Sequence, residues 1–527
     1  MEKIDITTRL FNKGFYPVDL PPEFSVVNGS KEFCEKFTNS LFEFKEIKKH
    51  KPSNPCQISI PKNRFDRRWL YLPNPLHHLK LANTIAKNWS EIEKFCSSST
   101  LSASRVEIEE EGNQLFKKGP FNKSTRERIS RSAGKKFVLI MDISNFYPSI
   151  YTHSLEWIFA ERRLKGKERK DRDFIGVALD QDIRLSQSGK TNGILVGPET
   201  SRIISEIIGV YLDKKLIETK IDFSGTRYVD DYHLYFNSLA DLEKAKTAIQ
   251  SELNMLNLTT NESKTEVKNV PEVFEESWVR ELTQFNFKGS DLEIQKQLIS
   301  VFSYAFKVYN EKAKSPVIKF LLSIIVRKNL ELSEDSKILL LELLRHSMEL
   351  DLRCSSRAFQ ILSKYDAFGT PEKFKLLFEK ELFRASELGR TFETLWILHG
   401  YNKLDITIPL DVVKNCIKQN DVLPLTMILY MENRSLIDST AQGLVKDHVL
   451  NSIFEESEPY LSEFWLPLYE GYKRDWWKWE KEIPEFMKQF EVEGIDFLNT
   501  SDSDWKAYGI SDYIEFHFDM HDNLLNK

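Results

Sequence analysis

The chain has 527 residues, of which 41% are hydrophobic and 29% charged, and its formal net charge is -5. This length predicts two to four domains, and the composition is that of ordinary globular material. The longest apolar runs, such as residues 320–326, are far too short to cross a bilayer, and the first ten residues lack an apolar signal core. We therefore expect a cytoplasmic protein with no membrane partner.

Charge is distributed unevenly along the chain. Residues 1–280 hold 44 Lys and Arg against 39 Asp and Glu, whereas the remaining residues hold 30 against 40. The mildly basic N-terminal half can bind phosphates locally, but the acidic C-terminal half is poorly suited to wrap around nucleic acid. The five cysteines show no CxxC spacing and their number is odd, which argues against a zinc site and predicts free thiols.

The first 136 residues are expected to form an N-terminal region. Short helical patterns alternate with turns up to a Pro-rich stretch around Pro52 and Pro55. Clustered basic residues follow, then a helical pattern over residues 76–95 and a loop over 97–104.

Residues 137–280 are expected to form a second unit in which strands and helices alternate. Residues 136–143 are apolar and β-rich, which predicts a buried strand, and residues 226–237 predict two short strands around a pair of aspartates. Helices are expected over residues 152–163, 200–218 and 239–256. This order predicts an α+β fold with an antiparallel sheet backed by helices.

From residue 281 the sequence pattern changes to a succession of helices, and residues 281–527 are expected to form a large all-α domain. Helical patterns of 12–18 residues follow one another from residue 291, separated by short turns. This texture is typical of an α-solenoid of paired helices, of the HEAT-repeat kind. No repeated signature is present in the sequence, so an irregular helical bundle stays an alternative.

Three aspartates lie where the strands of the second unit end. Asp142 closes the apolar strand, and Asp230 and Asp231 occupy a tight turn between two apolar strands. A carboxylate beside buried apolar residues is costly unless it is paired, and adjacent like charges repel unless a cation neutralises them. If the two elements are neighbours in one sheet, the three carboxylates converge, and carboxylate oxygens suit Mg²⁺. Taken alone, the aspartate pair would favour a solvated hairpin turn, since aspartate is common in turns.

Two further stretches accompany the aspartates. Residues 193–201 (GILVGPETS) lie between the acidic elements, and Gly197 would let the backbone approach a nucleotide or template base closely. Residues 256–265 (LNLTTNESKT) follow the acidic turn and supply Lys264, a candidate to protonate pyrophosphate as it leaves.

These four stretches occur in the order and approximate spacing of motifs A to D of reverse transcriptases, so residues 60–270 resemble that family. The YVDD box at residues 228–231 is its most specific element. The resemblance implies that Asp142 and Asp230 are the principal ligands of two Mg²⁺ ions, with Mn²⁺ as a substitute. Asp231 would complete the cluster, and the carbonyl of Ile143 would also reach a metal.

The same resemblance assigns residues around the nucleotide. Tyr147 matches the aromatic steric gate that rejects a ribose 2′-OH, which implies deoxynucleotide substrates; a core aromatic is the alternative. Residues 61–78 resemble the fingers segment. In it, Lys62, Arg64, Arg67 and Arg68 would meet the triphosphate or the template backbone, since guanidinium groups suit phosphate through paired donors.

One departure from the common pattern narrows the resemblance. Val196 stands where retroviral, retron and group II intron enzymes usually place a glutamine. With residues 147–153 (YPSIYTH) and the early GFYP at residues 14–17, this looks like the abortive-infection (AbiK-like) and related defence-associated reverse transcriptases of bacteria. Members of that group carry a long helical extension in place of an ordinary thumb.

That narrower resemblance implies DNA synthesis in antiphage defence. Some members synthesise DNA without a template and prime on a protein tyrosine, and others copy a noncoding RNA. Several assemble as homo-trimers or homo-hexamers. The expected partners are dNTPs, the DNA product, a noncoding RNA in the templated alternative, and further copies of the chain. The eighteen tyrosines do not reveal a priming residue. A non-catalytic nucleic-acid sensor or scaffold is the alternative of another class.

Overall fold

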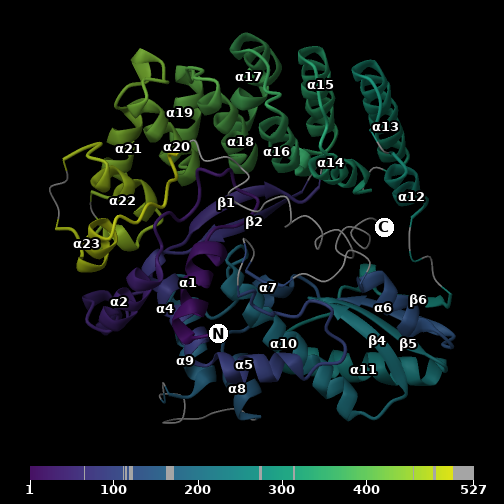
Figure 1. Cartoon of the computed structure of the whole chain (residues 1–527). Helices are drawn as coiled ribbons and strands as arrows, with labels where there is room; N and C mark the ends of the chain where they lie inside the picture. Colours follow the sequence, from purple (N-terminus) through teal and green to yellow (C-terminus); the bar gives the residue numbers. More distant parts are fainter. Residues whose placement is uncertain are drawn as a thin grey trace.

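The computed structural model describes residues 1–63, 66–110, 112, 115–117, 123–161, 171, 173–271, 274, 276–285, 287–312, 315–454, 456–478 and 482–501. Within these residues the chain combines a small antiparallel sheet with many helices, and the predicted α+β fold with a large all-helical region is confirmed. Figure 1 shows the helical region arching over the sheet-containing part. No helix among the described residues is both long and apolar enough to span a membrane.

The central sheet has the strand order β4-β5-β3-β6, and every neighbouring pair is antiparallel. Its strands are β3 (Phe137–Asp142), β4 (Phe223–Tyr228), β5 (Asp231–Phe236) and β6 (Glu266–Asn269). The helices of this part are α6 (Lys123–Ser132), α7 (Phe146–Ser149), α8 (Ser154–Ala160), α9 (Ile175–Leu185), α10 (Glu199–Glu218) and α11 (Leu239–Met255). Helix α11 packs on β3 and β5, and α10 packs on α11.

Side-chain alternation gives the sheet two different faces. Leu139 and Met141 of β3, with Tyr232 and Leu234 of β5, belong to the large apolar core that the helices share. Asp142 and Asp231 fall on the opposite face, because successive residues of a strand point to opposite sides. The acidic residues are therefore directed away from the helical layer.

The N-terminal region contains a β-hairpin that the sequence did not predict in full. Strands β1 (Cys56–Pro61) and β2 (Arg67–Leu72) pair antiparallel, and the Pro-rich approach to β1 obscured its strand pattern. The helices around it are α1 (Lys3–Gly14), α2 (Lys31–Ser40), α3 (Lys45–Lys48), α4 (Pro75–Lys87) and α5 (Trp89–Ser97). The single helix expected over residues 76–95 is thus two helices, which meet at Asn88.

The C-terminal region is a two-layered array of helices. It comprises α12 (Ser277–Thr283), α13 (Asp291–Glu311), α14 (Val317–Arg327), α15 (Glu334–Leu350), α16 (Ser355–Tyr365), α17 (Pro371–Glu387), α18 (Thr391–Lys403), α19 (Leu410–Gln419), α20 (Val422–Asn433), α21 (Leu444–Ser452), α22 (Trp465–Lys473) and α23 (Glu485–Val492). Helices α14, α16, α18, α20 and α22 each contact the next of that series, while α13 contacts α15 and α17 contacts α19. This alternation is the packing of a solenoid.

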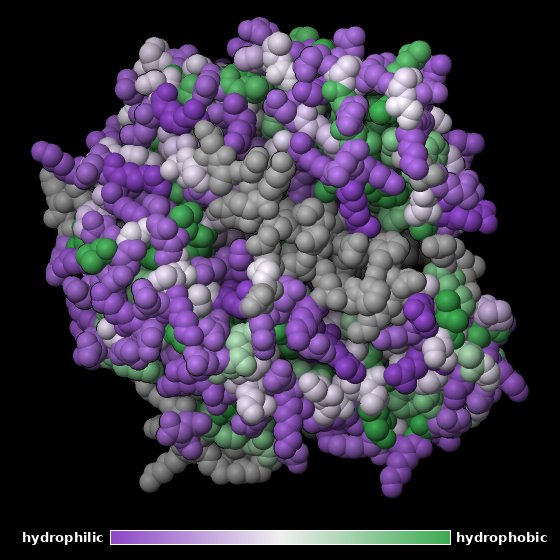
Figure 2. All heavy atoms as spheres, in the orientation of Figure 1, coloured by the Kyte–Doolittle hydropathy of each residue, from purple (hydrophilic) through white to green (hydrophobic). Residues whose placement is uncertain are grey.

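Local signals start several of these helices. Ser290 and Glu293 form a capping box at α13, and the Ser333 and Thr370 side chains accept backbone N–H bonds at the starts of α15 and α17. The face shown in Figure 2 is mainly hydrophilic, and apolar residues occur on it in small scattered groups.

One apolar core joins the N-terminal region to the helical array. Residues from Phe11 to Leu79 pack in the same cluster as residues from Trp278 to Leu498. The hairpin β1–β2 lies against α18 and α20, far from it in sequence. The helical array therefore supports the hairpin directly. All five cysteines are free and buried.

Candidate active site

The strand end at Asp142 lies beside the acidic turn. In the register of β3 and β5, Asp142 is directly opposite Asp231, and the Ile143 N–H donates to the Asp230 carbonyl at 3.2 Å. Directly opposed residues of antiparallel strands project from the same face. Asp142 and Asp231 are both buried. The structure thus brings together the three aspartates that the sequence singled out.

The turn between β4 and β5 holds an unusual backbone conformation. Val229 has a φ of 56°, in the left-handed region that β-branched residues rarely adopt. Its N–H donates to Ser104 Oγ at 3.0 Å, and its carbonyl accepts from Arg227 Nη1 at 3.0 Å. Such strain persists where surrounding contacts over-determine it, and it clusters at functional sites. These two bonds fix where the acidic turn lies.

A buried ion network stands behind the turn. Arg227 of β4 is fully buried and donates to Asp213 at 2.9 Å and to Glu206 at 3.1 Å, both on α10. The Tyr232 hydroxyl donates to Asp213 at 3.0 Å. Burial alone would lower the pKa of Arg227, but the two carboxylates hold that pKa well above its usual value. The guanidinium therefore stays charged and anchors the turn to α10.

The spacing of two acidic residues on α10 is the feature of the sequence that could have revealed this network. Glu206 and Asp213 are seven residues apart, so they share one face of α10, and both are buried. Gly209 lies between them, and a Cβ at that position would come within 2.5 Å of the Arg227 guanidinium. The helix thus supplies both the countercharges and the space for the arginine.

Lys264 contacts the acidic cluster. It ends a short 3₁₀ helix (Glu262–Lys264), and its Nζ lies 2.9 Å from Asp142 Oδ2. The neighbouring Asn261 N–H donates to the Asp142 carbonyl at 2.8 Å, which ties this segment to the end of β3. The ammonium is therefore positioned at Asp142, and its role as a proton donor to the leaving group stays a prediction.

Replacing Lys264 by alanine should lower the rate of nucleotide incorporation by roughly 10²–10⁴-fold, the usual contribution of a positioned proton donor. Lys264→Arg keeps the charge beside Asp142 and should retain stability, but its guanidinium is a much weaker acid. Single-turnover incorporation across pH checks this. A Lys264→Ala variant with the wild-type rate and pH profile would show that the lysine only pairs with Asp142.

The chemistry of the donor set fits divalent cations. Asp142, Asp230 and Asp231 offer carboxylate oxygens, the ligands that Mg²⁺ prefers, and the backbone of Ile143 lies between Asp142 and Asp230. Carboxylates from a strand end and from the adjoining turn would suit the two ions that the resemblance implies.

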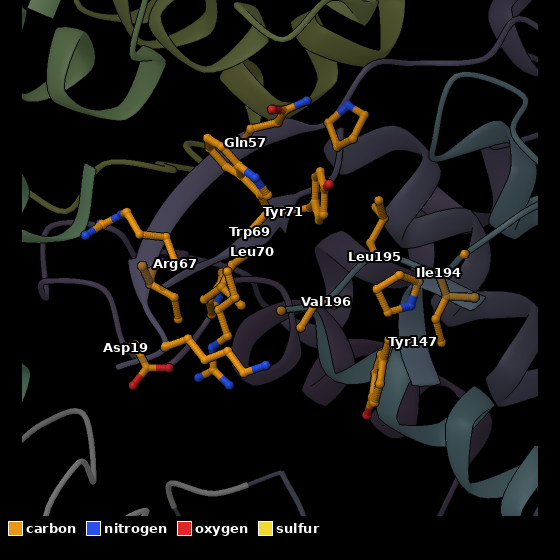
Figure 3. Close-up of a pocket in the computed structure, with 18 of the residues that line it drawn as sticks. Asp19, Gln57, Arg67, Trp69, Leu70, Tyr71, Tyr147, Ile194, Leu195 and Val196 are labelled. Carbon is orange, nitrogen blue, oxygen red and sulfur yellow. The ribbon is translucent and has the colours of Figure 1, made fainter. Parts of the chain in front are cut away.

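Asp142 and Asp230 line a cavity of about 1370 Å³, whereas Asp231 is buried behind them and is not part of its lining. Its walls come from the central sheet, the β1–β2 hairpin, the segment before α10 and the loops of the helical array, part of which is shown in Figure 3. The lining includes Asp142, Ile143, Tyr147, Asp230, Lys264, Lys62, Arg67, Arg68, Trp69, Tyr71, Val196, Gly197, Lys319, Arg353, Gln419 and Asp421.

Tyr147 lies on α7 and lines this cavity. Its hydroxyl accepts from Ser205 Oγ at 3.0 Å, and its ring packs at the edge of the apolar core. Burial raises the pKa of the Tyr147 phenol, so the hydroxyl stays protonated at neutral pH. The side chain is therefore held in place on the cavity wall, and its role as a steric gate stays a prediction.

Gly197 allows two segments of the chain, β2 and the loop before α10, to approach each other closely. Its φ is 133°, and a Cβ there would lie 2.9 Å from both the Tyr71 carbonyl oxygen and Pro17. The Tyr71 N–H donates to the Val196 carbonyl at 2.8 Å. The structure thus gives the glycine a role within the protein, which is to let β2 meet this loop.

The four basic residues of the hairpin have different surroundings. Lys62 and Arg68 are exposed and line the cavity. Arg67 instead donates to both carboxylate oxygens of Glu393 at 2.7 and 2.8 Å, and to the Ser59 carbonyl at 2.9 Å. Most of its donors are thus used within the protein, in contrast to the expected phosphate contact. Arg64 lies outside the described residues.

A four-stranded antiparallel sheet that presents aspartates from a strand end and a hairpin turn defines a palm-type nucleotidyltransferase. Residues 60–321 match the family Reverse transcriptase (RNA-dependent DNA polymerase). The chain therefore carries a reverse-transcriptase domain, and the protein is an enzyme, a nucleotidyltransferase of the RNA-directed DNA polymerase type. No curated protein matches the sequence significantly.

Several solved structures share part of the fold. Apo telomerase from Candida tropicalis is 12% identical, with a TM-score of 0.34, and the match covers 79% of this chain and 73% of that one. Telomerase from Candida albicans with a fragment of telomeric RNA is 13% identical, with a TM-score of 0.28 and coverages of 79% and 70%. With TM-scores below 0.5, these are distant likenesses of shape.

Proposed function

We propose that this enzyme is a DNA polymerase of the reverse-transcriptase type that acts in bacterial antiphage defence by abortive infection. The observation that carries the polymerase activity is the register that sets Asp142 opposite Asp231, with Asp230 in the adjoining turn and Lys264 on Asp142. The defence role rests on Val196 in place of the usual glutamine and on the long helical array after the domain.

The residues of the site have distinct roles in this proposal. Asp142, Asp230 and Asp231, with the Ile143 carbonyl, would hold two Mg²⁺ ions. When bound, the ions activate the attacking 3′ oxygen and neutralise charge on the leaving pyrophosphate. Lys264 would give a proton to that pyrophosphate, and Tyr147 would exclude a ribose 2′-OH. Lys62 and Arg68, exposed on the cavity wall, would bind phosphates of the nucleotide or of a strand.

The proposal has two forms, which differ in whether the enzyme copies a template strand. In the first, the enzyme extends a chain without a conventional template and primes on a protein tyrosine. In the second, it copies a partner noncoding RNA, which the matched RNA-dependent polymerase family favours. Nuclease treatment of the purified protein separates the two, because loss of synthesis, together with a specific copurifying RNA, indicates a template. A homo-trimer or homo-hexamer is the proposed assembly.

Removal of divalent metal tests the catalytic proposal directly. Purified protein with Mg²⁺ and each labelled dNTP should form DNA, and excess chelator should abolish incorporation. Because carboxylate oxygens bind hard cations reversibly, added Mg²⁺ or Mn²⁺ should restore it. Absence of incorporation under any metal would reject the proposal and favour a non-catalytic nucleic-acid sensor. Incorporation that persists unchanged in excess chelator would reject the metal-dependent mechanism.

A further inference from the structure

The β1–β2 hairpin has one buried and one open face. Ile58, Leu70 and Leu72 are buried in the core shared with the helical array. Gln57 is opposite Tyr71 in the register, and Trp69 is two residues from Tyr71 along the same strand. Residues opposite one another, or two apart on a strand, share a face. Gln57, Trp69 and Tyr71 therefore form one surface, and all three line the cavity that Asp142 and Asp230 also line.

Trp69 is unusually exposed for a side chain in the wall of a cavity. Its exposed fraction is 52%, whereas a tryptophan normally contributes a large apolar area to packing. Within the part of the chain that the structure describes, the indole of Trp69 has no ring-stacking or side-chain hydrogen-bond partner, although its backbone pairs with β1. An aromatic face held open in a polar cavity is suited to a ligand with a flat π surface.

The hairpin holds this surface rigidly. Ser59, opposite Trp69, donates its backbone N–H to Thr391 Oγ1 at 3.1 Å. On the adjacent strand, Arg67 makes its two-pronged ion pair with Glu393, whose side chain is only 2% exposed. Both partners belong to α18. A hairpin anchored in this way needs little backbone rearrangement when a ligand binds.

Charge around the surface favours a phosphate-bearing ligand. Lys62 and Arg68 are exposed near the hairpin tip, and Lys190 is exposed on the wall formed by the segment after α9. Cationic side chains beside an aromatic platform are the combination by which proteins hold single-stranded nucleic acid. Gln57 adds an amide that can donate to and accept from the edge of a base.

We propose that Trp69 is a stacking platform for a base of a single-stranded nucleic acid held in the cavity, with Gln57 at the edge of that base. The inference deepens the proposed function and rests on it. Figure 3 shows Trp69 beside Gln57 and Tyr71, well apart from Tyr147, which would meet the sugar of the incoming nucleotide. The cavity of about 1370 Å³ also exceeds the roughly 300–1,000 Å³ of a single small-ligand pocket. The stacked base is therefore that of a strand.

Binding measured without chemistry tests this platform. Fluorescence anisotropy with a labelled, unstructured oligodeoxynucleotide gives Kd for the full-length protein and for its Trp69→Leu and Trp69→Phe variants. Loss of one stacked base should weaken strand binding by roughly 5- to 150-fold in Trp69→Leu. Trp69→Phe should recover most of it, because it keeps an aromatic face. Phe42→Leu is the matched control, since Phe42 is 55% exposed outside the cavity lining.

The outcomes separate this proposal from the polymerase proposal. Unchanged strand affinity in Trp69→Leu, with unaltered melting temperature, would overturn the platform even if the wild type incorporates dNTPs. Weaker dNTP binding by calorimetry with unchanged strand affinity would also overturn it, since the base would then belong to the incoming nucleotide. If the wild type makes no DNA but Trp69→Leu loses strand binding, the platform stands and the polymerase proposal fails.

Discussion

Exchanging Asp230 and Asp231 together for asparagine is expected to reduce dNTP incorporation by about 10³-fold or more while the protein stays folded. Asparagine keeps the shape of each side chain but removes the charge that would hold a divalent cation. Asp231 is buried directly opposite Asp142, so the exchange also removes repulsion between like charges. The melting temperature should therefore stay the same or rise while activity is lost.

An exposed aspartate from the same part of the chain provides the control. Asp222 lies just before β4, and its side chain, 72% exposed, makes a long ion pair with Lys135 at 3.3 Å. Asp222→Asn should leave incorporation unchanged, because exposed pairs contribute little. Single-turnover incorporation and thermal melting of both variants decide the matter. A double variant that retains the wild-type rate would remove Asp230 and Asp231 from catalysis.

The parts of the site that local pattern defines were predictable from the sequence. An apolar β-rich run predicts β3, and an aspartate pair between two apolar runs predicts the β4–β5 hairpin; both lie within a few residues of expectation. The helical array also begins with α13 at Asp291, where the sequence predicts its first helix, because Ser290 and Glu293 mark that start locally. The pairing of Asp142 with Asp231 follows once the strands are neighbours in one sheet.

What the sequence could not show depends on contacts between distant residues. Arg67 looked like a phosphate ligand, but its partner Glu393 lies 326 positions away on α18. Likewise, Glu23 and His399 meet at 2.8 Å in the core that joins the N-terminal region to the helical array. Local periodicity carries no information about such pairs, so the dependence of the hairpin on the array appears only in the fold.

That dependence gives the helical array a part in the active site. The array contributes Thr391 and Glu393 to the hairpin, and it lines the cavity through residues such as Gln419 and Asp421. Burial raises the pKa of Asp421 to about 7, so this carboxyl can be neutral near physiological pH. When it is neutral, the Asp421 carboxyl does not repel the phosphates of a strand in the cavity.

Replacing Arg227 by methionine is expected to destabilise the protein by roughly 3–5 kcal/mol, because Glu206 and Asp213 would stay buried without their cation. The same change removes the donor to the Val229 carbonyl, so the acidic turn should lose its position. Urea unfolding would show the loss as a lower midpoint, and incorporation under folding conditions should also fall.

A neutral version of the network separates stability from positioning. In the triple variant Arg227→Met, Glu206→Gln, Asp213→Asn, no buried charge of the network is left unpaired, so much of the lost stability should return. The Val229 carbonyl still lacks its arginine donor, and the left-handed turn is then less firmly held. We therefore expect the triple variant to fold but to remain slow in incorporation. A triple variant that recovers both stability and rate would show that Arg227 balances buried charge and does not place the aspartates.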